Sequence, residues 1–364
     1  MKFPTYHIAI HDLLSMRIDD RVGWTDRILM RPMRGYQHHA HSSPAPGVPD
    51  VYVRIGPFAW TPRKDRLVDR RFHVADNYFA CQDQSKLLSW QAEIEGFSCG
   101  PTYMRLQANT LGSAALGSRL IDCMVRYRLA QRDAVPIHGC GIVGRSGACL
   151  LSGRSGVGKS TLAMQLLSRG YQLLGDNWVI VHDGWAKGFH LPLNIHAYNV
   201  APIVRARLTR GMRWTLRAWT LARQLSGGFL KKAVPLVLRD FFPEAVAERG
   251  PLEKVLTFSQ GEQLSIQPMP RAVGLSRLVA NDMTDREAFH RYQWAYAAAY
   301  PESPVAKHWL TLADRLDRAI PSHVPFYNVI VPRHITPEIV GAIEELIEQP
   351  CPSPAVAITT YTAA

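Results

Sequence analysis

The sequence predicts an α/β fold made of two domains and a short tail. A smaller β-rich domain that ends in a helix is expected over residues 1–132, because short β-type segments separated by Gly and Pro recur there. An α/β domain is expected over residues 133–350, because strand-like and helical segments alternate around one glycine-rich loop. Residues 351–364 are expected to form a loose tail.

Within the first domain, residues 1–50 are expected to be weakly structured. The segment Gln37–Asp50 carries His38, His39 and His41 among Ser, Pro and Gly, which favours an exposed loop over a metal site. A small antiparallel sheet is predicted from four strand-like segments: Val51–Ile55, Arg71–Ala80, Leu87–Ile94 and Thr102–Leu106. Apolar residues at helical spacing then predict a helix from Ser113 to Gln131.

Composition limits the class of protein. The chain has 364 residues, 47% of them hydrophobic, which is enough for a sizeable core. It contains no apolar run of about 18 residues and no apolar block near the N-terminus, so we expect neither a transmembrane segment nor a signal peptide. Six cysteines are scattered without a CxxC pair, which indicates reduced thiols and a cytoplasmic location. The net charge of +12 favours an acidic partner.

The motif around which the second domain is organised runs from Gly153 to Ser160 and fits G-x-x-x-x-G-K-[ST]. An apolar strand precedes it at Ala148–Leu151, and a helix with leucines on one face follows. The glycines let successive backbone N–H groups point at phosphate oxygens, and the helix N-terminus favours negative charge. Lys159 would reach the outer phosphates and Ser160 would ligate Mg²⁺. The sequence therefore predicts a site for ATP and Mg²⁺ formed by Gly153, Arg154, Ser155, Gly156, Val157, Gly158, Lys159, Ser160 and Thr161.

A histidine is expected beside this loop. The strand-like segments Val135–Val143 and Ala148–Ser152 flank a turn and predict a β-hairpin. If the hairpin is centred between Arg145 and Ser146, His138 lies opposite Gly153 and thus next to the phosphates. The alternative is a core histidine whose ring bonds to the backbone.

An aspartate is expected at the same place. After Gly170, a short strand (Tyr171–Leu174) leads to Asp176, and a second strand (Trp178–Val181) follows. If the first strand runs parallel to the strand that enters the loop, Asp176 meets the phosphates. It would then be a Mg²⁺ ligand together with Ser160, or the base that receives a hydroxyl proton. A simple turn aspartate is the alternative.

A basic helical insertion is expected over residues 201–239. It holds no acidic residue and nine basic ones: Arg205, Arg207, Arg210, Arg213, Arg217, Arg223, Lys231, Lys232 and Arg239. Trp and Leu alternate with the arginines along the expected helix. A groove for an acidic peptide, a contact with anionic lipid, a contact with nucleic acid and a solvated basic face all fit this pattern.

The segments around His138, the loop and Arg169–Asn177 together resemble the HPr kinase/phosphorylase superfamily, which shares its nucleotide-binding core with phosphoenolpyruvate carboxykinases. The resemblance covers about residues 135–182 and implies a P-loop kinase core of that type. It implies that Asp176 deprotonates an acceptor serine and that His138 helps to position phosphate. It also implies that Lys159 and Ser160 hold phosphate and Mg²⁺.

Three departures set this chain apart from that pattern. Asn177 stands in place of a second Asp, Thr161 in place of a Glu, and the Glu- and Gly-rich signature is absent from His190–Ile195. The overall layout is closer to the kinases of peptide-maturation clusters, including those that phosphorylate a lasso-peptide precursor.

We therefore expect an ATP- and Mg²⁺-dependent serine kinase that acts on a peptide or small protein, an acidic one being favoured by residues 205–239. A kinase of a small-metabolite hydroxyl and a nucleotide-controlled binding module are the alternatives. Nucleic acid is not an expected partner, and a homo-oligomer is left open. Fold alone does not assign function.

Overall fold

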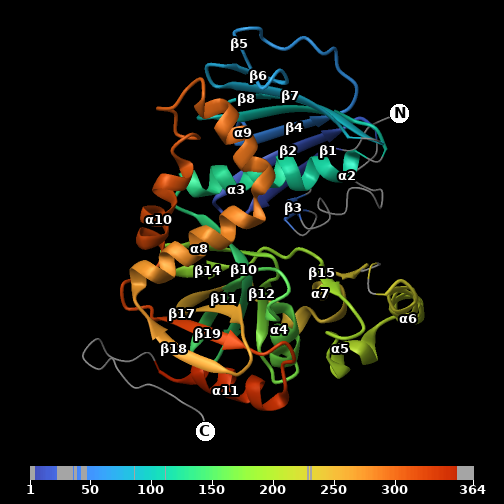
Figure 1. Ribbon diagram of the computed structural model, residues 1–364, viewed down its shortest axis with the longest axis vertical. Helices are drawn as coiled ribbons and strands as arrows, with labels where there is room; N and C mark the ends of the chain where they lie inside the picture. The colour runs from blue at the N-terminus through green and yellow to red at the C-terminus, as the bar shows by residue number, and fades with distance from the viewer. Residues whose placement is uncertain are drawn as a thin grey trace. The chain divides into compact units, whose positions relative to one another are not determined.

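The computed structural model describes residues 5–22, 36, 39–41, 47–85, 87–110, 112–227, 229 and 232–350. The chain forms two compact units (Figure 1). Unit 1 consists of Met1–Val135 and Met283–Arg315, and unit 2 of Pro136–Asp282 and Leu316–Ala364. The first division lies close to the expected boundary at residues 132–133. The expected tail, residues 351–364, lies outside the described residues.

Unit 1 is built on a nine-stranded sheet with the order β3-β1-β2-β4-β9-β8-β7-β6-β5. Its strands are β1 (Thr5–Ile10), β2 (Leu14–Asp20), β3 (Ala40–His41), β4 (Val51–Ile55), β5 (Arg66–Val68), β6 (Phe72–Ala75), β7 (Tyr78–Ser85), β8 (Leu88–Glu95) and β9 (Thr102–Ala108). The sheet is larger than the predicted one, and it is mixed rather than antiparallel. The reason is that β4 lies between β2 and β9 and runs parallel to both.

The expectation of weak structure over residues 1–50 is wrong for β1 and β2. Met16 and Ile18 of β2 are buried, and the one residue between them is only partly covered. Ile8 and Ile10 of β1 are likewise buried on either side of a partly covered residue. This period of two is that of a strand with one face on a core. Of the three histidines expected in an exposed loop, His39 is buried, and His38 lies outside the described residues.

The helix predicted between Ser113 and Gln131 is confirmed. It is formed by α2 (Ser113–Leu116), the π-helical turn η2 (Gly117–Ile121) and α3 (Asp122–Gln131), which follow one another without a break. Two more helices begin in the part of unit 1 that comes late in the sequence, α9 (Glu287–Ala297) and α10 (His308–Ala319).

That late segment, residues 283–315, was expected in the α/β domain and instead packs into unit 1. Its aromatic side chains complete the core of the nine-stranded sheet. The ring of Tyr292 lies 5.4 Å from that of Phe79 on β7. The hydroxyl of Tyr296 accepts a hydrogen bond of 2.8 Å from the backbone N–H of Asn77. Burial of such large aromatic side chains is among the strongest local contributions to packing, so the segment stays with this sheet.

Unit 2 contains an eight-stranded sheet with the order β11-β10-β13-β14-β17-β19-β18, in which β12 also pairs with β10, and β11 with β17. Its strands are β10 (Val135–Gly144), β11 (Gly147–Gly153), β12 (Gln172–Gly175), β13 (Trp178–His182), β14 (Trp185–Lys187), β17 (Arg249–Gln260), β18 (Ser265–Met269) and β19 (Phe326–Val331). A separate two-stranded sheet joins β15 (Leu193–Ile195) to β16 (Val234–Leu236).

The helices of unit 2 are α4 (Lys159–Leu167), α5 (Pro202–Arg207), α6 (Arg210–Leu225), α7 (Leu238–Phe241), the 3-10 turn η3 (Pro243–Ala245), α8 (Arg271–Asp285, whose last residues lie in unit 1) and α11 (Pro337–Glu348). Leu162 and Leu166 of α4 share one apolar core with Ile339 and Ile343 of α11. This packing fixes the helix that follows the glycine-rich loop. No helix within the described ranges is long and apolar enough to cross a membrane.

Candidate active site

The hairpin of β10 and β11 has the predicted register. Gly144 pairs with Gly147 and Gly139 pairs with Ser152, so His138 comes next in line, level with Gly153. The Ser152 hydroxyl donates a hydrogen bond of 3.0 Å to the backbone carbonyl of His138, which ties the two strands together at this point. His138 is buried. A short turn thus places the histidine at the mouth of the loop, because the register of a hairpin follows from its turn.

The loop itself bends through two glycines. Gly156 and Gly158 have φ of +87° and +103°, in the left-handed region that side chains disfavour. Helix α4 begins immediately afterwards at Lys159. Open space surrounds the position where Gly156 would carry a Cβ, whereas Val157 packs into the core. The loop is therefore anchored by one apolar side chain and presents bare backbone on either side of it.

Asp176 reaches the loop because β12 runs parallel to β11, the condition set by the sequence analysis, although a third strand lies between them. Strand β12 does not pair with β11; it pairs antiparallel with β10, which lies between them. Since β10 is antiparallel to both neighbours, β11 and β12 run in the same direction and end at the same edge of the sheet. The backbone N–H of Gly139 donates a hydrogen bond of 3.0 Å to the carbonyl of Asn177. That bond fixes the turn holding Asp176 beside the residue that follows His138.

A side-chain hydrogen bond joins Asp176 to Ser160 in this site. The Ser160 hydroxyl lies 2.9 Å from each carboxylate oxygen of Asp176, and that carboxylate is buried. Burial raises the pKa of Asp176 above its ordinary value, because water no longer solvates the charge; Ser160, Lys159 and His138 act in the opposite direction. A carboxylate with a raised pKa is better matched to taking up a proton near neutral pH.

Lys159 is buried too, and its ammonium group lies within the loop. It donates hydrogen bonds to the backbone carbonyls of Gly153, at 2.5 Å, and Arg154, at 3.1 Å. These carbonyls hold a positive charge at the N-terminus of α4, where an anion would be bound most favourably.

These groups line one cavity of about 220 Å³. The predicted residues at its wall are His138, Ser155, Gly156, Gly158, Lys159, Ser160, Thr161, Asp176 and Asn177. Three other predicted nucleotide-binding residues do not line it. Gly153 and Val157 are buried below the loop, and the Arg154 side chain is exposed.

The cavity is also lined by four residues that were not predicted from the sequence: Asn194, His196, Tyr198 and Asn199. The side-chain oxygen of Asn199 accepts a hydrogen bond of 2.7 Å from the backbone N–H of His196, which closes a tight turn. The rings of His196 and Tyr198 stack within that turn, 5.0 Å apart and 10° from parallel. The sequence offers one indication of these residues, a run of polar and aromatic side chains around a short strand, but the run matches no known motif.

The residues present fit a phosphate chain with a hard divalent cation. The loop offers bare backbone beside an ammonium group, and Ser160 and Asp176 offer adjacent oxygen donors, the ligand type that Mg²⁺ prefers. Within the described part of the chain, no cluster of three or more His, Cys, Asp or Glu side chains forms a ready-made metal cage. Magnesium sites often use one or two protein oxygens and take the rest from phosphates and water.

Comparison with known proteins points to one kinase family. An HPr kinase/phosphorylase from Pelodictyon phaeoclathratiforme is 30% identical over 100 residues, which is 28% of this chain and 27% of that protein. One from Lactiplantibacillus plantarum is 36% identical over 81 residues, 20% of this chain and 24% of that protein. Part of this chain is similar to HPr kinase/phosphorylases. The matched part spans about a quarter of the length of these curated relatives.

No protein-family model matches the chain. Among solved structures, the HPr(Ser) kinase/phosphatase from Coxiella burnetii aligns with 58% of this chain and 87% of that chain, at 12% identity and a TM-score of 0.27.

Proposed function

We propose that this chain is an ATP- and Mg²⁺-dependent kinase that phosphorylates a serine-type hydroxyl of a peptide or small protein. The observation that carries the proposal is the convergence of Asp176, Ser160, Lys159 and His138 on one cavity at the glycine-rich loop. The local similarity to HPr kinase/phosphorylases supports the same class of reaction.

Each side chain has a role that follows from its place. The acceptor oxygen would form a bond to the γ-phosphorus of ATP as the bond to the bridging oxygen breaks and ADP leaves, and Asp176 would receive the hydroxyl proton. Lys159 would exchange its bonds to loop carbonyls for bonds to phosphate oxygens. His138, one residue from the Gly139 that anchors the Asp176 turn, would help to position the transferred phosphate.

Mg²⁺ would be held by Ser160 and Asp176 together with phosphate oxygens, and it would neutralise charge on those phosphates. Phosphoryl transfer depends mainly on alignment and charge neutralisation, which this small polar cavity can supply.

The acceptor class that we propose is the precursor of a ribosomal peptide, of the lasso type. A cytoplasmic location fits this proposal, and the cysteines at positions 81, 99, 123, 140 and 149 are free thiols.

The test is incubation of the purified chain with ATP, Mg²⁺ and synthetic serine peptides, read by mass spectrometry. The expected product is a peptide heavier by one phosphate, absent when the serine is replaced by alanine and absent with Lys159→Met. A small-metabolite kinase would consume ATP with a metabolite and leave all peptides unmodified. A nucleotide-controlled binding module would bind ATP and form no phosphorylated product. Either result would overturn the proposal.

A further inference from the structure

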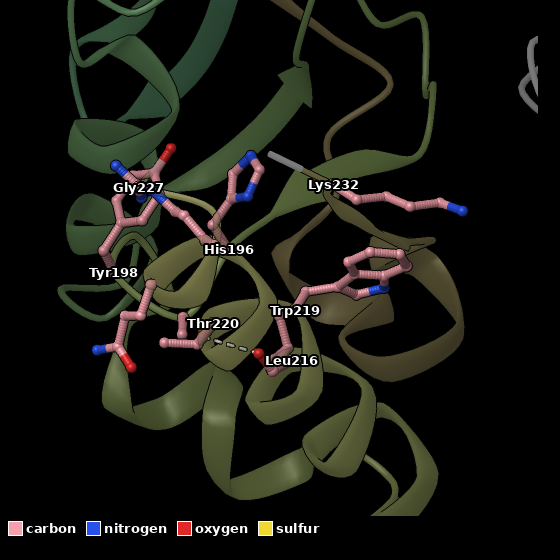
Figure 2. A pocket seen from close by; sticks show the side chains of 10 residues that line it. His196, Tyr198, Leu216, Trp219, Thr220, Gly227 and Lys232 are labelled. Atoms are coloured by element: carbon pink, nitrogen blue, oxygen red, sulfur yellow. Dashed lines mark hydrogen bonds between the residues drawn. The ribbon is translucent and has the colours of Figure 1, made fainter. Parts of the chain in front are cut away.

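A second cavity of about 360 Å³ adjoins the active site. We call it the α6 pocket; its polar and aromatic walls are His196, Tyr198, Trp219, Thr220, Arg223 and Lys232. His196 and Tyr198 line the active-site cavity as well, so the two cavities share one wall. Figure 2 shows the rings of His196, Tyr198 and Trp219 around the α6 pocket, with Thr220 bonded back to the Leu216 carbonyl.

Two segments far apart in sequence bring these walls together. Strands β15 and β16 pair antiparallel, with Ile195 opposite Val234. The turn that begins at His196 and the residues just before β16, including Lys232, therefore lie at the same end of this small sheet. Helix α6 closes the pocket, and its buried Leu216 fixes it to the core of unit 2.

The pocket carries two cations on aromatic walls. The guanidinium of Arg223 lies 5.2 Å from the centre of the Tyr198 ring, and the ammonium of Lys232 lies 4.8 Å from that of Trp219. A cation that rests on a ring face is held in place and keeps its N–H donors for other partners. None of the residues recorded at the wall of this pocket is acidic. A carboxylate entering it would meet two positive charges at positions already fixed.

We propose that the α6 pocket binds an acidic residue of the acceptor peptide, close in sequence to the serine that is phosphorylated. This inference rests on the proposed function and specifies its substrate. Because both cavities are lined by His196 and Tyr198, a peptide with its hydroxyl at Asp176 would pass these two residues to place a neighbouring side chain in the α6 pocket. Charge-assisted hydrogen bonds to a carboxylate are about twice as strong as neutral ones, so one acidic side chain would fix the register of the peptide.

A nucleobase is the competing occupant, because the pocket is aromatic. A neutral base would stack on the rings and could accept hydrogen bonds from Arg223 or Lys232, but only a carboxylate brings a full negative charge to the two cations. Charge complementarity therefore favours the peptide, and the nucleobase becomes an outcome of the test.

The test measures binding and needs no transfer. Two labelled peptides of the same sequence, with alanine in place of the acceptor serine, differ only in carrying glutamates or glutamines beside that position. Fluorescence anisotropy with the full chain should give tighter binding of the glutamate peptide by roughly tenfold, as expected for one charge-assisted contact. Arg223→Glu and Lys232→Glu should each abolish this preference.

Arg213→Glu is the matched control, since it makes the same charge change on an exposed residue of the same helix that does not line the pocket. It should retain the preference. Arg223→Gln and Lys232→Gln serve if a charge reversal prevents folding, and each should weaken the preference.

Three results would overturn the inference. The wild-type chain could bind both peptides equally. Arg213→Glu could lose the preference as fully as Arg223→Glu, which would indicate a diffuse basic surface. Or the pocket variants could weaken ATP binding and leave the peptide preference intact, which would assign the pocket to the nucleobase. Preferential binding without any phosphopeptide would refute the kinase and leave this pocket assignment standing.

Discussion

Asp176→Asn separates the chemistry of the site from its structure. The amide has the shape of the carboxylate, and its oxygen can still accept the hydrogen bond that Ser160 donates at 2.9 Å. What is lost is the negative charge and the ability to take up a proton. Ground-state contacts should therefore survive while the reaction fails.

The substitution should affect stability and turnover in opposite directions and to different extents. Because burial raises the pKa of Asp176, its ionised form is held at a cost in the folded protein, and a neutral amide removes that cost. The variant should be at least as stable as the parent. Loss of a general base lowers turnover by roughly 10²- to 10⁴-fold, and loss of a metal ligand adds to this. We expect turnover to fall by at least about 100-fold.

The assay combines three measurements on the variant and the parent: the thermal unfolding midpoint, ATP affinity without Mg²⁺, and the rate of phosphopeptide formation. Asp183→Asn is the matched control, because it is the same substitution on an exposed residue in the β13–β14 turn. That control should change none of the three.

The reasoning fails if Asp176→Asn transfers phosphate at a rate near that of the parent, since no base would then be needed at this position. It fails in a different way if the thermal unfolding midpoint of the variant lies well below that of the parent, since the carboxylate would then stabilise the folded protein.

Three further outcomes follow from the structure. Burial raises the pKa of Asp122 from 3.8 to about 7, so the free energy of unfolding should fall as pH rises through that interval, by at most about 4 kcal/mol. Denaturant melts near pH 5 and pH 8 should show this loss in the parent and not in Asp122→Asn. The same pH dependence in both proteins would contradict the prediction. A Cβ on Gly139 would come 2.6 Å from the backbone carbonyl oxygen of Leu151, so Gly139→Ala should lower the free energy of unfolding in urea by about 1–3 kcal/mol. Gly341 of α11 has open space at its Cβ position, so Gly341→Ala should raise that free energy by about 0.5–1 kcal/mol. Similar values for the two variants would refute the packing argument. Asn177→Asp adds a carboxylate to the cavity wall and should lower the Mg²⁺ concentration needed for half-maximal transfer about two- to tenfold, and an unchanged or raised requirement would show that this side chain does not face the metal.

The sequence by itself determined the parts of the site that local rules fix. The glycine-rich motif defines a strand, a loop and a helix N-terminus within a few residues, and the backbone of Gly156 and Gly158 follows from their lack of a side chain. A short turn sets the register of β10 and β11, so the position of His138 beside Gly153 could be counted from the turn. Asp176 could be placed from the order of elements, because a strand–loop–helix–strand unit brings the carboxyl ends of β11 and β12 to the same edge of the sheet.

Only the tertiary structure decided what lies across from these residues. The turn at His196 and Tyr198 faces the loop because β15 pairs with β16, a contact between distant segments that no local pattern encodes. The same holds for residues 283–315, whose aromatic side chains join a sheet formed much earlier in the chain. It holds also for β1 and β2. Their alternation of apolar and polar residues is short, and it indicates strands only once β2 is seen to pair with β4. Local geometry is determined by neighbouring residues in the sequence. A pairing between distant segments depends instead on which apolar faces remain to be buried once the local helices and strands have formed.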